Sequence, residues 1–212
     1  MPGYVIHLAV AKEYLKKSKN RNENEEEFIN GVIFPDSVKD KAITHYGEKS
    51  SKSNLYEFLK DKNVNNSFNR GYFLHLLTDY LFYNKYVDRM TKDMYNDYDI
   101  TNKKLIDKYN VELPNEIKGS VFFKEGDLQI LSYDLLYKMI VENYIFHFFL
   151  KIFYIAFSIH RLLQISFFYF IPSSHKKHYL YFFLAFLLFP IYLYFTPYTL
   201  FLQVFINFLY TF

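Results

Sequence analysis

A change of composition near Glu142 constrains the fold of this chain more than any other feature. Residues 1–142 carry all 22 acidic residues and 21 of the 25 Lys and Arg residues, so their formal charge is −1. Residues 143–212 contain no Asp, Glu or Gly and only four Lys and Arg residues, which gives a formal charge of +4. We therefore predict two domains, a helical domain over 1–142 and a hydrophobic tail over 143–212.

Apolar residues in the first part recur at helical spacing, and no run alternates as a strand would. The stretches that fit this spacing lie near residues 3–18, 25–34, 52–61, 67–92, 99–109 and 126–142. Asn66 or Ser67 is a suitable N-cap for the fourth stretch, and Pro114 is placed to open a short turn. The sequence predicts an all-α fold, a helical bundle with a modest core.

The tail has the length and hydrophobicity of a membrane segment. Residues 179–212 carry no charge and exceed the roughly 20 residues that cross a bilayer, although Pro190 and Pro197 interrupt them. Residues 143–171 are also apolar but carry Lys151, His160 and Arg161 internally. One interpretation is a membrane hairpin of helices. Its basic connection, 172–178, would then lie on the cytoplasmic side together with the first domain.

A second interpretation of the tail is that it is not a native segment. Of the 34 residues in 179–212, 15 are aromatic, and Ala185 and Val204 are the only small apolar residues. Phe, Tyr, Ile, Leu, Asn and Lys all have codons made of A and T alone. The tail would then be an out-of-frame reading of A/T-rich DNA after about Val141, in place of a soluble helical end.

Composition also limits the cellular compartments in which the chain is expected and the partners that it is expected to bind. Cysteine is absent, so the chain has neither disulfides nor thiolate metal ligands. The basic run at 16–21 is followed at once by Glu23 and by Glu25 to Glu27, so no basic face forms and no nucleic-acid partner is expected. The first residues lack the basic and apolar regions of a signal peptide. We expect a cytoplasmic domain.

A histidine and an aspartate lie four residues apart in an otherwise apolar stretch. His75 and Asp79 fall within 71–82, so on a helix both side chains project from one face. A buried carboxylate needs a partner or a cation, because an unpaired charge is costly in an apolar environment. The pair is therefore either a His–Asp hydrogen bond within a core or part of a metal site.

Three further residues are candidate ligands. Asp36 follows Pro35 at the end of an apolar stretch, and His45 stands in Thr-His-Tyr-Gly, so both are expected in loops at helix ends, where sites are commonly assembled. His7 lies on the first predicted helix, beside an apolar stripe. Taken singly, each also fits a structural role: Asp36 as a turn residue, His45 as a surface histidine and His7 as a core histidine.

Together, these residues resemble the zinc-dependent phospholipase C family, and in particular its signal-less bacterial members. The matching elements are Met-Pro-Gly-x-x-x-His, Pro-Asp, Thr-His-Tyr and Gly-x-Phe-x-His-x-x-x-Asp-Tyr, within residues 1–109. The resemblance implies an all-helical domain that holds zinc ions. It implies that one zinc is bound by Asp36, His45, His75 and Asp79. Asp79 would bridge to a neighbouring zinc, to which His7 contributes.

The chain departs from the family pattern after Asp79. The family continues with a His and then a His-x-x-x-Glu pair, whereas this chain has Lys85 and no further His before His147. Asp97 and Asp99 could supply carboxylates instead, or they could serve as N-caps for the helix around residues 100–109.

The ligand types also indicate the chemistry. Two histidines and two carboxylates suit zinc, and also iron or manganese. The resemblance predicts a hydrolase in which metal-activated water attacks a phospholipid or a small phosphoester, with Asp36 as a catalytic base as well as a ligand. The alternative is a non-catalytic protein, in which a structural metal stabilises a membrane-tethered helical interaction domain.

Overall fold

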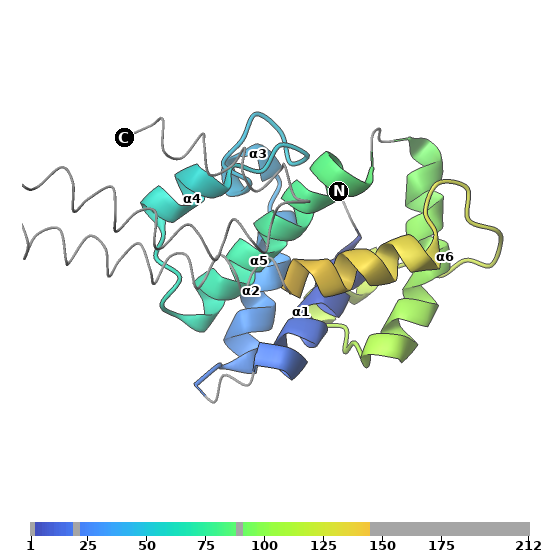
Figure 1. Cartoon of the computed structure of the whole chain (residues 1–212), viewed down its shortest axis with the longest axis horizontal. Coiled ribbons are helices and arrows are strands. Elements are labelled where there is room, and N and C mark those ends of the chain that lie inside the picture. Colours follow the sequence, from blue (N-terminus) through green and yellow to red (C-terminus); the bar gives the residue numbers. More distant parts are fainter. Residues whose placement is uncertain (1–2, 19–21, 88–90, 145–212) are drawn as a thin grey trace, which may run out of the picture. The chain divides into compact units, whose positions relative to one another are not determined.

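The computed structural model describes residues 3–18, 22–87 and 91–144, and both interpretations of the 143–212 tail concern residues that lie almost wholly outside these ranges. The described residues form helices and no strand, which confirms the all-α prediction for this part of the chain (Figure 1). The elements are α1 (Tyr4–Ser18), α2 (Glu25–Ser37), α3 (Lys41–Thr44), α4 (Leu55–Asp61), α5 (Ser67–Leu81), α6 (Lys92–Tyr109), the π-helical turn η1 (Phe82–Tyr86), the 3-10 helix η2 (Asn115–Ser120) and a last helix over 133–144.

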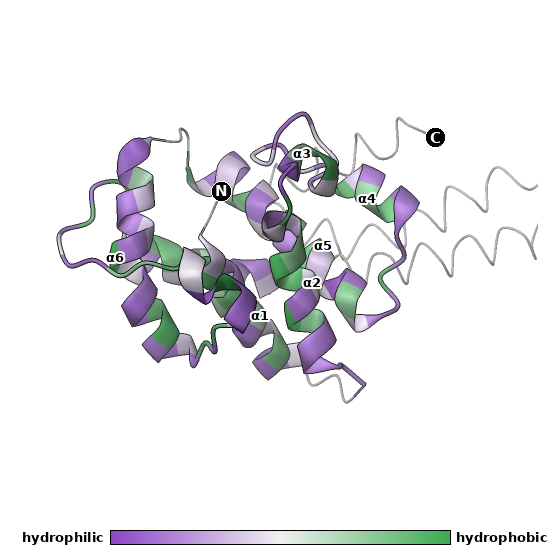
Figure 2. Ribbon diagram, turned by 180° about the vertical axis from the view of Figure 1, so that it is seen from behind, coloured by the Kyte–Doolittle hydropathy of each residue, from purple (hydrophilic) through white to green (hydrophobic). Residues whose placement is uncertain are grey.

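Helix α1 is the central element of the core. Residues 5–11 are all buried, so the first two turns contact other parts of the protein on every side. A helix that is apolar all round is expected only in such an interior position. The last helix packs beside α1, where Tyr144 stacks obliquely on Tyr14 and donates to the carbonyl of Lys17. Figure 2 shows hydrophobic residues concentrated where α1, α2 and α5 meet, and hydrophilic residues on the outer turns.

Helices α2 and α5 cross at two glycines. A Cβ added at Gly31 would lie 2.0 Å from the carbonyl oxygen of Phe68, and one added at Gly71 would lie 2.0 Å from that of Phe28. Only residues without a side chain permit the two backbones to approach so closely. The crossing therefore brings the main chain of α2 within reach of side chains on α5.

Asparagine and aspartate side chains set the starts of several helices. Asn24, Asp40, Asn54 and Asn66 each accept a hydrogen bond from a backbone N–H in the first turn that follows, at 2.7–3.2 Å. The N-cap predicted at Asn66 is thus confirmed. The helix predicted near 52–61 is α4. It starts at Leu55 rather than near residue 52, because Asn54 caps it.

The second half of the described chain differs from the prediction in its boundaries. The stretch expected to be one helix over 67–92 ends as α-helix at Leu81 and continues as the π-helical turn η1. Helix α6 begins at Lys92, not near residue 99, so Asp97 lies inside it and the N-cap role suggested for Asp97 and Asp99 is wrong. The short helical turn expected after Pro114 is present as η2.

Asp97 explains why the last helix begins late. Its buried carboxylate accepts hydrogen bonds from the backbone N–H groups of Gln129, Ile130 and Leu131, at 2.7–3.2 Å. These amides are consequently unavailable for a helix, and the predicted helix over 126–142 forms only from residue 133 onward. Ser132 accepts from the N–H of Leu135 and caps it.

Among the residues that the structure describes, no helix has both the length and the hydrophobicity needed to cross a membrane.

Candidate metal centre

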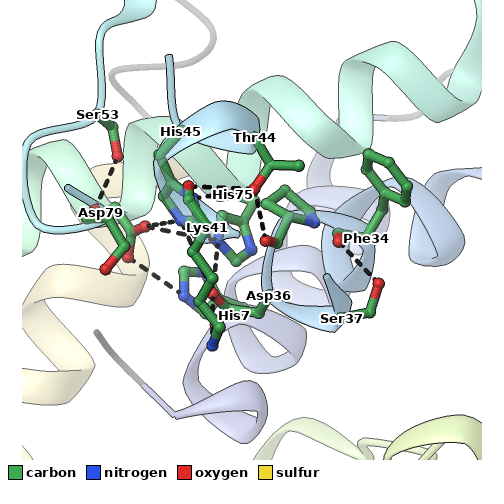
Figure 3. Close-up of polar contacts among 12 residues, drawn as sticks. His7, Phe34, Asp36, Ser37, Lys41, Thr44, His45, Ser53, His75 and Asp79 are labelled. Carbon is green, nitrogen blue, oxygen red and sulfur yellow. Dashed lines mark hydrogen bonds and ion pairs between the residues drawn. The ribbon is translucent and has the colours of Figure 1, made fainter. Parts of the chain in front are cut away.

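All five residues singled out in the sequence meet in the interior. His7 comes from α1, Asp36 from the last turn of α2, His45 from the end of α3, and His75 and Asp79 from α5 (Figure 3). None has more than 6% of its surface exposed. They form two overlapping groups of potential metal ligands, His7/His75/Asp79 and Asp36/His45/His75, in which the candidate atoms lie within 4.8 Å of one another. These buried groups could hold a metal ion.

Asp36 lies in a helix rather than in the expected loop. Pro35 is inside α2, and the helix continues through Asp36 to Ser37. The carbonyl of Pro35 accepts a hydrogen bond of 2.8 Å from the hydroxyl of Thr44, which ties the end of α2 to α3. Tyr72 of α5 donates to the carbonyl of Thr44 at 2.5 Å. Helices α2, α3 and α5 are thereby joined at Thr44, the residue before His45.

His45 is oriented by a main-chain carbonyl. Its Nδ1 lies 2.7 Å from the carbonyl oxygen of Lys41, one turn earlier. A carbonyl can only accept, so Nδ1 carries the proton, and in the neutral ring Nε2 then presents a lone pair. The histidine was expected at a helix end, and it is the C-cap residue of α3, although it is fully buried rather than on the surface.

His75 is oriented in the same way by a different helix. Its Nδ1 lies 2.7 Å from the carbonyl oxygen of Val32 on α2, next to the crossing glycine Gly31. The proton is again fixed on Nδ1, and Nε2 of the neutral ring is free to bind a cation. Histidines that bind metals commonly donate their other N–H to a carbonyl in this manner.

The free imidazole nitrogens and the carboxylates face one another. The two Nε2 atoms of His45 and His75 are 3.3 Å apart, and Asp79 Oδ2 lies 2.8 Å from the first and 3.5 Å from the second. Asp36 Oδ1 lies 3.8 and 3.9 Å from the same two nitrogens. Four ligands at about 2.0–2.1 Å from a tetrahedral ion are about 3.3 Å apart. The observed spacings scatter around that value.

Hydrogen bonds do not satisfy the carboxylate oxygens of this arrangement. Asp36 Oδ1 and both oxygens of Asp79 are buried without a hydrogen-bond partner among the described residues. His45 and His75 cannot both carry a proton on Nε2, because the two protons would point at each other across 3.3 Å. His75 Nε2 lies 3.5 Å from Asp79 Oδ2, at the upper limit of a hydrogen bond. A cation would satisfy all four groups at once.

The charges agree with this description. Burial alone would raise the pKa of Asp79, but His45, His7 and His75 hold it well below its ordinary value, so Asp79 is ionised. Burial tends to lower the pKa of His75, yet Asp79 and Asp36 raise it overall. The cluster thus combines an ionised buried carboxylate with imidazoles whose protonation depends on it.

His7 faces the other oxygen of Asp79. Its Nε2 is 3.4 Å from Asp79 Oδ1, and its ring stacks on that of His75 at 3.8 Å with an interplanar angle of 6°. Burial and the neighbouring His75 lower the pKa of His7 to about 4, so the ring is neutral near pH 7. Neither of its nitrogens has a hydrogen-bond partner among the described residues. Asp79 thus presents one oxygen to His7 and the other to His45 and His75.

Two tyrosines with buried hydroxyl groups lie within electrostatic range of Asp79. The hydroxyls of Tyr83 and Tyr98 are buried without hydrogen-bond partners among the described residues. Burial, together with the negative charge of Asp79, raises the pKa of both phenols, so both remain protonated donors.

The other candidate residues have different partners. Asp97 accepts from three backbone amides, and Asp99 pairs with Lys124 at 2.9 Å, so neither belongs to the cluster. Lys85 forms an ion pair with Glu142.

Sequence reasoning missed Lys41, whose ammonium lies 3.4 Å from Asp36 Oδ1. Its position four residues before His45 was the available signal. The carbonyl of Val32, which orients His75, could not be identified from residue types because it belongs to the main chain. Gly71, one turn before His75, was the signal that another backbone could approach this helix closely.

Comparison with known proteins yields no relative. No family model, curated protein or solved structure matches the chain.

Proposed function

We propose that the chain is a metal-dependent phosphoester hydrolase of the zinc-dependent phospholipase C type. One zinc ion would be held by Asp36, His45, His75 and Asp79, and the substrate would be a phosphodiester or phospholipid. One observation carries the proposal. Two imidazole nitrogens with fixed lone pairs and two carboxylates meet in the interior, and three of the carboxylate oxygens accept no hydrogen bond from the described residues.

The ligand set suits hydrolysis. A bound zinc ion would polarise a phosphoryl oxygen and lower the pKa of water toward about 7. Asp36 is the residue best placed to accept a proton from that water, since its Oδ1 lies at the edge of the cluster, 3.8 and 3.9 Å from the two histidine nitrogens. The carbonyls of Lys41 and Val32 hold the two imidazoles in the orientation that this chemistry needs.

A second ion would fit the other side of Asp79. Its Oδ1 faces His7 Nε2 at 3.4 Å, while its Oδ2 faces His45 and His75. A carboxylate divided in this way is the arrangement of a bridging ligand. Two ions would allow both the attacking and the leaving oxygen to be stabilised.

Elemental analysis of the purified full chain tests the metal directly. We expect one or two ions per chain, with zinc rather than iron or manganese, and loss of metal in His75→Ala and Asp79→Asn. Asp99→Asn is the matched control, because Asp99 pairs with a surface lysine outside the cluster. Folded protein that binds none of these metals would leave the five residues as a polar core and would end the hydrolase proposal.

A second candidate is a non-catalytic protein with a structural metal. Two observations favour it: every ligand is buried, and Lys85 pairs with Glu142 where the family has another histidine. The hydrophobic tail would then tether a helical interaction domain to a membrane. Hydrolysis of a generic phosphodiester or a lecithin-like substrate separates the candidates. The hydrolase requires turnover that a chelator abolishes and zinc restores, whereas the structural protein shows no turnover in either state.

A further inference from the structure

The loop over residues 121–132, which joins η2 to the last helix, carries two adjacent phenylalanines on its outside. Phe122 is 60% exposed and Phe123 is 55% exposed, more than any other phenylalanine in the described part of the chain. Figure 1 shows this loop projecting outward next to α6. A single exposed apolar residue needs no explanation, but two adjacent rings form a patch of the kind that marks an interaction site.

Helix α6 holds the main chain of this loop in place. The side-chain amide of Asn102 donates to the carbonyl of Phe122 at 2.9 Å, and the N–H of Lys124 donates to the carbonyl of Asp99 at 3.1 Å. The ammonium of Lys124 also pairs with the carboxylate of Asp99 at 2.9 Å. The backbone on both sides of Phe123 is therefore already ordered, so a ligand of the two rings would not bear the entropic cost of ordering it.

The same contacts suit the loop to an apolar environment. A polar main-chain group that leaves water without a hydrogen bond costs free energy. The carbonyl of Phe122 and the N–H of Lys124 already have partners within the protein. Both groups can therefore leave water together with the rings and remain hydrogen-bonded.

The size and charge of the patch indicate its partner. A phenylalanine side chain presents about 200 Å², so the exposed parts of the two rings amount to about 230 Å². A stable protein interface takes about 800 Å² from each partner. Insertion into a lipid surface needs only a few apolar side chains and no complementary shape. Residues 118–127 contain two lysines and two acidic residues, so their formal charge is zero. This balance fits a zwitterionic lipid, because an anionic surface attracts segments with an excess of Lys or Arg.

We propose that Phe122 and Phe123 insert into the interfacial region of a zwitterionic phospholipid bilayer, and that α6 holds the loop over 121–132 in the conformation that does so. The site shares no residue with the metal centre, so the inference goes beyond the proposed hydrolase. It is also separate from the membrane hairpin predicted for 143–212, because the loop belongs to the helical domain.

Single tryptophans report the position of the loop, because the chain has no native Trp. Phe122→Trp, Phe123→Trp and the control Ile43→Trp would each be measured in the full chain with phosphatidylcholine vesicles, with and without brominated lipid as a quencher. Ile43 is 72% exposed on α3, so this control tests whether exposure alone causes insertion. We expect emission at shorter wavelength and strong quenching at positions 122 and 123, and an unchanged spectrum at position 43. The local signal separates insertion of the loop from binding through residues 143–212.

Phe122→Ser in the Phe123→Trp chain tests the contribution of the neighbouring ring. This change should reduce the ratio of inserted to free loop about tenfold to a hundredfold, because more than half of that ring would no longer leave water. Phe122→Leu should retain insertion. Glu125→Gln and added salt should each change the ratio less than twofold, since a zwitterionic surface does not depend on charge attraction.

Two results would overturn the proposal. One is that the tryptophans at positions 122 and 123 stay in water, or are quenched no more than the one at position 43. The other is a shift of emission without vesicles that grows with protein concentration, because the rings would then bind a second copy of the chain. The signal requires neither metal nor turnover, so its outcome is independent of the hydrolase proposal.

Discussion

Gly31→Ala tests the helix crossing on which the orientation of His75 depends. The added Cβ would lie 2.0 Å from the carbonyl oxygen of Phe68, and real Cβ contacts are not shorter than 3.0 Å, so α2 and α5 must separate by at least about 1 Å. The hydrogen bond from His75 Nδ1 to the carbonyl of Val32, now 2.7 Å, would lengthen to about 3.7 Å and be lost.

The expected cost combines strain with the loss of this bond. Forcing an extra carbon into a packed contact costs about 1–3 kcal/mol, and leaving a buried donor unpaired costs about 1–3 kcal/mol more. We therefore expect Gly31→Ala to lower the free energy of unfolding by about 2–6 kcal/mol and to weaken metal binding. Urea denaturation monitored by circular dichroism, with and without zinc, measures both effects.

Gly119→Ala is the matched control, because a Cβ at Gly119 meets no atom within 4 Å. This variant should leave the urea midpoint and the metal content nearly unchanged. If Gly31→Ala behaves like Gly119→Ala, the close crossing does not hold His75 in place and the orientation argument is refuted.

Three further predictions concern other parts of the chain. Burial and His75 lower the pKa of His7 to about 4, whereas the pKa is about 6.5 in the unfolded chain. The unfolded state therefore binds the proton more readily. As the pH falls from 6.5 to 4, the free energy of unfolding of the metal-free protein should decrease by up to about 3 kcal/mol. His7→Gln should remove this part of the pH dependence in chelator-treated protein, and parallel stability curves for the two proteins would contradict it. Asp97→Asn should lower the free energy of unfolding by about 2–4 kcal/mol and speed hydrogen exchange at residues 129–131, because the carboxylate accepts from three amides there; unchanged exchange would show that the carboxylate does not hold this segment. Independent DNA reads across codons 136–146 decide the origin of the tail, since an intact frame refutes the out-of-frame interpretation and a slipped frame refutes the membrane hairpin.

The helices of the first domain could be predicted because their signal is local. Apolar spacing marked the stretches that became α1, α2, α4 and α5, and the short polar side chain of Asn66 marked a helix start. The boundaries after residue 81 could not be predicted in this way. Asp97 binds amides more than thirty residues later in the chain, and nothing in the local sequence shows that 129–131 will be held out of a helix.

The candidate ligands were accessible to sequence reasoning for a similar reason. His75 and Asp79 share a helical face, and their residue types are informative on their own. The distances within the cluster depend instead on how α2 crosses α5 and on where α3 places His45, which are properties of tertiary packing. Lys41 was missed although it lies four residues before His45, because a lysine at the start of a short helix is usually a solvated surface group.

The two acceptors that orient His45 and His75 are main-chain carbonyls, those of Lys41 and Val32. No side-chain replacement deletes a main-chain carbonyl, provided that the backbone path is kept. The side chains at positions 32 and 41 can consequently vary while the imidazoles retain their tautomers and their direction, as long as Gly31 and Gly71 keep the two helices close. The orientation of the two imidazoles therefore depends on the path of the backbone and not on a second set of polar side chains. Sequence changes that keep this path preserve the centre.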